Sequence, residues 1–395
     1  MTVRANKPAF NIREKLKELT HSIGLKGREL MRAATVQEAR DLVSAGRKNI
    51  IINGDMRIAQ RGTSASGTGS TFNPVAVDKF APGAANGPFS TYDFTQESDA
   101  PEGFNYSFKV DATSPQTITS GYQRVGYAVE GYDFAQSAYG TSKAKTMTLS
   151  FWVKSNVPGN YSVSFSNSSS RQYSTVYTIN QSGVWEKKYI TLPGDPGSTT
   201  NNITNGIGIF IAFALRVASD FSSTDKTYEW VDSDDTARHF GHTVDVGANI
   251  GDTWQITGVQ LEVGKNATEF EYRPYGEELA LCQRYYYKIS SVGNPAGAYA
   301  MGFAYDANTA LLTIPFPVEM RILPSSMDQS GTASDYRILQ NGTTTTCDQV
   351  PSISDSTKTN ATVNMFDTGG YTQGQGLMGR WNSGENGYLG FSAEF

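Results

Sequence analysis

Apolar residues recur at every second position in four separate stretches of this sequence, 147–153, 161–165, 207–215 and 259–263. A period of two places successive side chains on opposite faces of a β-strand, so each stretch predicts a strand with one face in a core. In 207–215 the intervening residues are mostly Gly and Ala, which indicates a central strand or a close second layer. The chain is therefore expected to be mainly β.

Residues 49–275 carry about ten strand patterns, enough for a two-sheet jelly roll. An opening strand at 49–53 ends in Asn53-Gly54, a strong turn signal. Residues 64–70 are rich in Gly, Ser and Thr and predict a loop, whereas 184–192 predict a strand. After the 259–263 strand, Phe270 and Tyr272 resume the alternation until Pro274 stops it.

Residues 276–395 predict a smaller C-terminal β domain. Residues 277–283 form a short helical or coil hinge, and strand-like runs follow at 285–287 and 299–305. A hairpin is expected around 382–387, because Leu389 and Phe391 alternate with small or polar residues just after it.

Residues 1–48 predict short helices that form an anchor or adaptor rather than a domain. Apolar residues follow Asn11, a plausible N-cap, at heptad spacing, and Gly24 ends the pattern. The resulting attachment or oligomer seam comprises Phe10, Ile12, Leu16, Leu19 and Ile23. A capping box at Thr35 to Glu38 begins a second helix. The seam is under two heptads long, so it must pack against its own copies or a host assembly.

Charge is unevenly spread along the chain. Residues 1–49 hold eleven Lys or Arg and five Asp or Glu, whereas the whole chain has a net charge of −5. Because acidic residues are interspersed in the basic arm, a solvated helix face or protein docking is favoured over nucleic-acid binding. No apolar run reaches the ~20 residues of a membrane helix, and the N-terminus lacks the apolar core of a signal peptide.

The two cysteines, Cys282 and Cys347, are expected to be reduced and partly buried, although the sequence leaves their pairing open. Asp232, Asp234 and Asp235 cluster, but their Ser and Thr neighbours indicate an acidic loop. No catalytic residue and no cofactor is therefore assigned, and we expect a protein that is not an enzyme.

Metal binding has little support in the sequence. His239 and His242 form a pair without the three or four ligands of a zinc site. The sequence leaves open whether a structural Ca²⁺ ion is bound, because loop oxygens alone can bind one.

Tyr and Trp are abundant, and flat aromatic rings can stack on sugars. Tyr371, Trp381 and Tyr388 lie near the distal end and are the candidates for glycan stacking. The alternative is that they are core or subunit-interface aromatics.

Several motifs resemble a known family. They are GVQLEVG from Gly258, A-T-x-F-E-x-R from Ala267, E-L-x-x-C-Q-R-Y-Y from Glu278, N-x-I-I-N-G-D-M-R-I-A-Q-R-G-T from Asn49, and P-x-x-M-R from Pro317. Together with K-P-A-F-N-I-R-E-K-L near the N-terminus, these resemble bacteriophage tail-fibre and virion-surface proteins that carry a jelly-roll domain like a carbohydrate-binding module. Val77-Asp78-Lys79-Phe80 stands where that family usually has an Asp-Arg-Trp-like tripeptide.

The resemblance implies a structural virion fibre protein, assembled in the host cytoplasm and displayed on the virion surface. It implies a homotrimer that attaches to tail or capsid proteins through residues 1–48 and presents β domains to a host-surface glycan. A capsid decoration fibre without a receptor role and a glycan depolymerase are the alternatives. The expected domains are 1–48, 49–275 and 276–395.

Overall fold

The computed structural model describes residues 32, 47–70, 72–168, 170–197, 201–222, 228–368, 370–382, 384 and 386–395. The chain divides into two compact units, Met1–Lys48 and Asn49–Phe395. The predicted anchor helices and the seam from Phe10 to Ile23 lie outside the described residues. The division at 275/276 stays a prediction.

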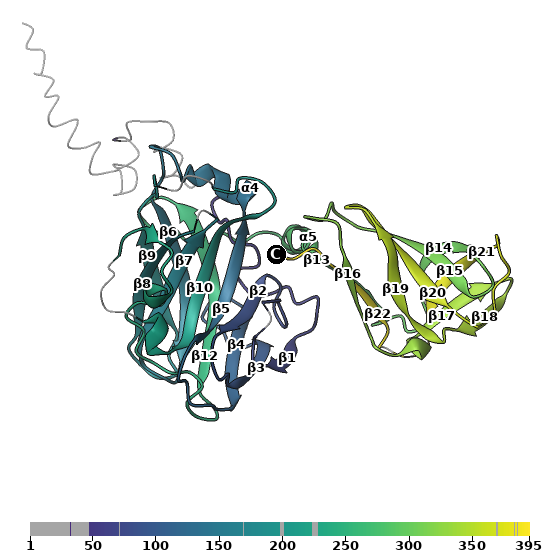
Figure 1. Ribbon diagram of the computed structural model, residues 1–395, viewed down its shortest axis with the longest axis horizontal. Coiled ribbons are helices and arrows are strands. Elements are labelled where there is room, and N and C mark those ends of the chain that lie inside the picture. The colour runs from purple at the N-terminus through teal and green to yellow at the C-terminus, as the bar shows by residue number, and fades with distance from the viewer. Residues whose placement is uncertain are drawn as a thin grey trace, which may run out of the picture. The chain divides into compact units, whose positions relative to one another are not determined.

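The first β-sandwich consists of two six-stranded antiparallel sheets (Figure 1). In order across the sheet, sheet A contains β1 (Ser64–Gly67), β3 (Thr91–Glu97), β4 (Ser107–Ser114), β12 (Thr253–Val263), β6 (Met147–Ser155) and β9 (Glu186–Leu192). Sheet B contains β11 (Val231–Asp232), β8 (Arg171–Ile179), β7 (Gly159–Asn167), β10 (Ile207–Val217), β5 (Tyr122–Glu130) and β2 (Phe80–Ala85). This arrangement confirms the mainly β fold, and all four alternating stretches are strands.

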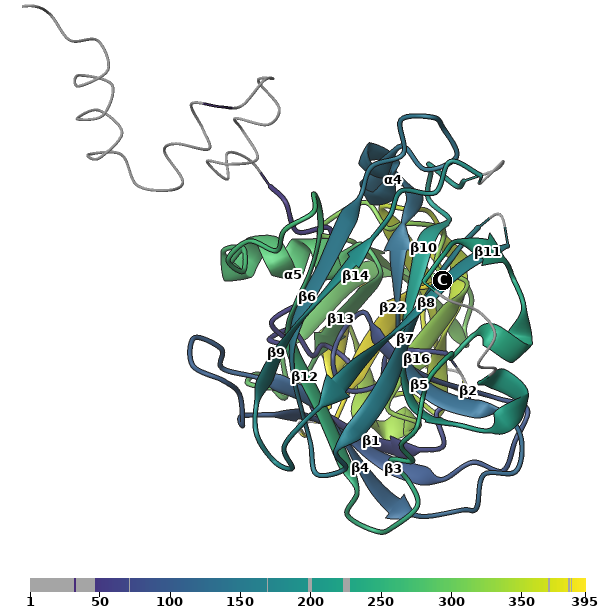
Figure 2. The ribbon, with the colours of Figure 1, turned by 90° about the vertical axis from the view of Figure 1, so that its left-hand side faces the viewer.

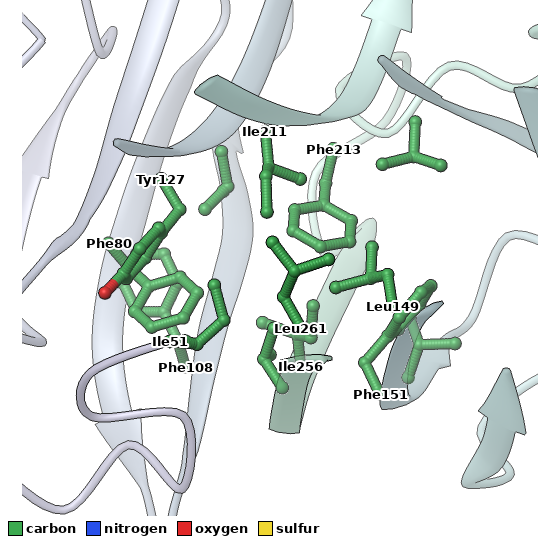
Figure 3. Close-up of a cluster of buried hydrophobic side chains, with 14 of the residues drawn as sticks. Ile51, Phe80, Phe108, Tyr127, Leu149, Phe151, Ile211, Phe213, Ile256 and Leu261 are labelled. Carbon is green, nitrogen blue, oxygen red and sulfur yellow. The ribbon is translucent and has the colours of Figure 1, made fainter. Parts of the chain in front are cut away.

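The core lies between sheets A and B. Figure 2 shows β6, β9 and β12 on one side and β5, β7, β8 and β10 on the other. The apolar phase of each strand points inward, as Leu149 and Phe151 of β6 and Ile211 and Phe213 of β10 illustrate (Figure 3). Burial of these side chains supplies most of the favourable free energy of folding.

The opening segment 49–52 is buried but is not a strand, which corrects the prediction. The side chain of Asn49 occupies the pairing positions on β12: its Nδ2 donates to Val259 O, and its Oδ1 accepts from Leu261 N. A single ladder bond remains, from Ile50 N to Leu261 O at 2.9 Å. The predicted turn follows, with Asn53 at a φ of 59°.

Two further boundaries differ from the sequence interpretation. Part of the predicted loop at 64–70 forms β1, an edge strand paired with β3. Conversely, Phe270 and Tyr272 belong to no strand. They lie in a return segment that is fixed to buried Gln260 of β12, because Glu271 N donates to Gln260 Oε1 and Gln260 Nε2 donates to Glu269 O.

The second sandwich is built from sheets C and D. Sheet C contains β13 (Tyr286–Ser290), β22 (Tyr388–Ser392) and β16 (Ser326–Gln329). Sheet D contains β18 (Thr343–Thr346), β17 (Tyr336–Gln340), β21 (Gly376–Trp381), β14 (Ala298–Ala304), β15 (Thr309–Pro315), β20 (Asn360–Phe366) and β19 (Gln349–Ser356).

The predicted hairpin around 382–387 is wrong. β21 pairs with β14 and β17 in sheet D, whereas β22 pairs with β13 and β16 in sheet C. The chain changes sheets at this turn because Leu389 and Phe391 of β22 pack into the core between the two sheets.

Helices are few in the described part of the chain. The hinge is confirmed as helical and forms α5 (Tyr275–Gln283); α4 (Gly131–Phe134) follows β5. Short 3₁₀ turns occur at Ala135–Ser137, Ser219–Phe221, Asp235–Ala237 and Ala333–Asp335. Among the described residues, no helix has the length and apolar character needed to cross a membrane.

Candidate ligand-binding surface

Trp152 lies on the solvent side of sheet A. Its neighbours in β6, Phe151 and Val153, are fully buried, whereas Trp152 is half-buried. In the register of the sheet, Trp152 stands between Lys187 of β9 and Thr257 of β12. The indole ring therefore lies on the outer face, one strand in from the β9 edge of the sheet.

A glycine makes room for this ring. Gly258 lies at the register shift of β12 and has a φ of 61°, in the left-handed region that favours glycine. A Cβ there would lie 2.7 Å from Cζ of Phe104 and 3.1 Å from Cδ1 of Trp152. The bare backbone thus lets Phe104 and Trp152 lie together over the strand.

The return segment after β12 adds two more rings. The ring centroids of Phe104 and Phe270 are 5.1 Å apart, and Tyr272 lies 5.6 Å from Phe104 and 4.9 Å from Phe270. Tyr272 is 54% exposed, and its hydroxyl donates to Gly103 O at 2.8 Å. This hydrogen bond ties the return segment to the β3–β4 loop.

Tyr189 of β9 extends the aromatic surface across the sheet. It is 57% exposed and pairs with Ser150, so it lies diagonally next to Trp152, a spacing of about 7–8 Å that aromatic side chains can span. Lys187 Nζ lies 5.5 Å from the Tyr189 ring centroid. We call Phe104, Trp152, Tyr189, Phe270 and Tyr272 the aromatic strip.

Charged groups flank the aromatic strip. Asp99 accepts a hydrogen bond from Trp185 Nε1 at 3.2 Å and forms an ion pair with Lys154, whose Nζ lies 5.1 Å from the Trp185 ring. Burial would raise the pKa of Asp99, but these hydrogen bonds outweigh it and hold the pKa below its usual value. Partly exposed rings beside ammonium and carboxylate groups can stack on a sugar and bind its hydroxyls.

The three aromatic residues predicted to stack on glycan lie elsewhere. Trp381 is only 4% exposed, and its ring stacks on Tyr299 at 4.1 Å in the second core. Tyr371 is also buried in this core. Tyr388 is half-exposed beneath Lys288, whose Nζ lies 4.2 Å from the ring centroid. The structure therefore leaves only Tyr388 of the three with a ring that is partly open to solvent.

A signal for the aromatic strip was present in the sequence. Trp152 and Tyr189 fall in the polar phase of their strands, alternating with the buried Phe151 and Ile190, and this alternation places both rings on the solvent side, although neither was among the predicted site residues. Phe104, Phe270 and Tyr272 carried no such signal, since they lie in loops whose course depends on tertiary contacts.

The His pair and the Asp cluster have structural roles. His239 and His242 are buried, and burial lowers the pKa of His242 to about 4, so this imidazole is neutral at pH 7. Asp232 pairs with Arg171, and Asp234 caps a 3₁₀ turn. Within the described residues, no three His, Cys, Asp or Glu side chains are placed to hold a metal ion.

A polar hollow lies at one end of the first sandwich, lined by Pro115, Gln116, Thr117, Ile118, Asp245 and Ala248. Asp245 is the one carboxylate in this lining. Its Oδ1 lies 2.9 Å from Arg216 Nε and its Oδ2 2.9 Å from Arg216 Nη2. Hydrolysis by two carboxylates would need a second acid at this hollow.

Cys282 and Cys347 are both free thiols, and both are buried, whereas the sequence led us to expect only partial burial. They belong to different clusters of buried side chains.

No protein-family model matches this chain, and no curated protein matches it. Among solved structures, tailspike protein 4 of bacteriophage CBA120 is 12% identical with a TM-score of 0.30; the match covers 55% of this chain but only 21% of the tailspike chain. A CBM4 carbohydrate-binding module is 15% identical, covering 54% of this chain and 98% of its own, with a TM-score of 0.28.

The family 11 carbohydrate-binding module of a Clostridium thermocellum cellulosomal cellulase is 13% identical, covering 55% of this chain and 97% of its own, with a TM-score of 0.25.

Proposed function

We propose that this protein is a structural component of a bacteriophage virion surface and that its first sandwich binds a host-surface glycan through the aromatic strip. The observation that carries the binding proposal is that the exposed Tyr189 and Tyr272 and the half-buried Trp152 lie over the outer face of sheet A beside charged groups. Soluble domains rarely leave several large rings exposed together unless the surface binds something.

The virion setting rests on the resemblance of the motifs between Asn49 and Arg321 to phage virion-surface proteins. With it come three further proposals: attachment to tail or capsid proteins through residues 1–48, assembly as a homotrimer, and display on the virion after assembly in the host cytoplasm. A binding role without catalysis is favoured over depolymerase activity, because the hollow at Asp245 is lined by a single carboxylate that is already paired with Arg216.

Retention on immobilised host polysaccharide tests the binding proposal. Trp152→Ala combined with Tyr189→Ala removes two rings and should weaken retention at least about tenfold. Tyr132→Ala is the matched control, since Tyr132 is also exposed but follows β5 at α4 rather than lying on the outer face of sheet A. Wild-type protein that no host polysaccharide retains would favour a capsid decoration protein, and release of reducing sugar would reinstate a depolymerase.

A further inference from the structure

The outer face of sheet D carries apolar side chains where a solvent-facing sheet is normally polar. Met301 is 70% exposed and Phe303 is 49% exposed, both on the outer side of β14. The neighbouring residues Gly302 and Ala304 point toward the core, where Ala304 is buried. The exposure of Met301 and Phe303 therefore follows from the strand's alternation.

The register of the sheet makes these side chains contiguous. Met301 pairs with Met378 of β21, which pairs with Leu339 of β17. Phe303 pairs with Leu311 of β15. We call Met301, Phe303, Leu311, Leu339 and Met378 the apolar patch; it crosses four adjacent strands.

The two flanks of the apolar patch differ in charge. On the β17 side, Arg337 pairs with Arg380, so two guanidinium groups lie next to each other. Arg380 donates to Ala296 O, whereas the Arg337 Nε is buried and has no hydrogen-bond partner. On the opposite side, the exposed Asp355 of β19 lies on the outer face opposite Thr362. An apolar centre with a polar and charged rim is the anatomy of a protein interface.

We propose that the apolar patch is the contact surface for a second copy of this chain. Charge complementarity selects this partner. Where the symmetry axis runs parallel to the strands of sheet D, the β17 flank of one copy meets the β19 flank of the next, so Arg337 and Arg380 approach Asp355 of the neighbour. The whole outer face of sheet D, which surrounds the apolar patch, has seven strands about 4.8 Å apart and about 20 Å long and measures roughly 600 Å², somewhat below the ~800 Å² that each partner contributes to a standard interface.

This inference deepens the self-assembly part of the proposed function by naming the face that makes the contact. It uses no residue of the aromatic strip. Loss of glycan retention and loss of assembly can therefore be measured separately.

Light scattering on the full-length protein provides the first test. Wild-type protein should have a mass of at least two chains of 42.9 kDa each. Met301→Asp combined with Phe303→Asp places two carboxylates in the apolar patch and should lower that mass. Leu323→Asp is the matched control, because Leu323 is an exposed apolar residue outside the patch and should leave the mass unchanged. A monomeric wild type at micromolar concentration would overturn the proposal.

Cross-linking locates the contact even if residues 1–48 also hold copies together. A photoreactive benzophenone side chain in place of Phe303 should give a covalent dimer whose linked peptide maps to sheet D of the other copy. Oligomeric protein that yields no such cross-link, or one mapping outside sheet D, would overturn the proposal.

Charge reversal tests whether the two charged flanks meet, and it leaves the side chains of the apolar patch unchanged. Arg337→Glu alone and Asp355→Arg alone should each lower the yield of the cross-linked dimer. The double variant should give a higher yield than either single variant, because a carboxylate at position 337 then faces a guanidinium at position 355, although the unchanged Arg380 keeps the yield below that of the wild type. Failure of the double variant to exceed both single variants would refute the pairing of the two flanks.

Discussion

Arg284 and Glu130 form an ion pair between the residue that follows α5 and the end of β5. Arg284 Nη2 lies 2.6 Å from Glu130 Oε1, and Arg284 Nε donates to Glu130 Oε2 at 2.9 Å. The hydroxyl of Tyr285 donates to the same Oε2 at 2.6 Å. This buried carboxylate thereby connects sheet B to the segment that leads into the second sandwich.

Other residues of the motifs that resemble phage proteins meet at the same junction. Glu278 Oε1 accepts from Asn53 N at 2.7 Å and from Arg273 Nη1 at 3.1 Å. Arg321 of the P-x-x-M-R motif donates to Ala393 O at 2.8 Å. Residues of these motifs thus build a structural junction, whereas the aromatic strip draws only partly on them.

Arg284→Ala should destabilise the protein. It leaves the Glu130 carboxylate buried with Tyr285 as its remaining close donor. We expect a loss of about 2–4 kcal/mol, somewhat below the 3–5 kcal/mol of fully buried pairs because the Arg284 side chain keeps partial solvent contact. Denaturant unfolding at pH 7 measures this loss in the free energy of unfolding. Lys358→Ala, which breaks the exposed pair with Glu319, should cost under about 1 kcal/mol.

Acid should remove the contribution that Glu130 makes to the stability of the fold. Burial alone would raise the pKa of Glu130, but hydrogen bonds from Arg284 and Tyr285 bring it below the ordinary 4.5. A carboxylate with a lowered folded-state pKa stabilises the fold above pH 4.5, and this stabilisation is lost as the pH falls through the folded pKa. The stability difference between wild type and Arg284→Ala should therefore shrink below pH 4.5; a difference independent of pH would contradict this assignment.

Lys79→Met should stabilise the protein at pH 7. Lys79 is buried, with its Nζ 3.1 Å from the Tyr285 ring centroid and 3.9 Å from Glu394 Oε2. Burial lowers the pKa of Lys79 from 10.5 to about 8, so charging this amine opposes folding. Glu394 keeps Arg61 as a partner at 3.4 Å. We expect a gain of about 1–3 kcal/mol.

The gain from Lys79→Met should depend on pH. Between pH 8 and 10.5 the unfolded wild-type chain binds more protons at this position than the folded chain, so wild-type stability rises with pH. The advantage of Lys79→Met should accordingly be largest below pH 8 and decline toward pH 10.5. Thermal unfolding across this range, with exposed Lys143→Met as the control, measures it.

Trp381→Ala should mainly lower the stability of the protein, whereas Trp152→Ala should mainly lower its binding to polysaccharide. Trp381 is a core side chain, so its truncation should cost about 3–5 kcal/mol and leave polysaccharide retention unchanged wherever the protein stays folded. Trp152 is half-buried, so its truncation should cost less stability and should weaken retention. Weakened retention in a folded Trp381→Ala protein would return this residue to the binding surface.

Gly258→Ala should disturb both the aromatic strip and the fold. The added Cβ conflicts with Phe104 and is strained at a φ of 61°. We expect a loss of about 1–3 kcal/mol together with weaker glycan retention. Gly183→Ala is a suitable control, because it has a similar φ of 72° but open space around its Cβ, so it should lose stability without losing retention.

The sequence by itself determined the class of fold and the phase of its main strands. The alternation in 147–153 and 207–215 predicted which side chains face the core, because a strand places every second side chain on the same side. It also predicted the helical hinge that became α5 and the turn at Asn53-Gly54.

Tertiary structure alone decided which strands pair and where the residues outside the strands lie. β21 and β22 were predicted to form a hairpin but enter different sheets, because the two strands cover opposite sides of the single core between sheets C and D. The positions of the aromatic residues also could be predicted only in part from the sequence. Alternation exposes Trp152, whereas the burial of Trp381 and the gathering of Phe104, Phe270 and Tyr272 depend on contacts between segments far apart in the chain.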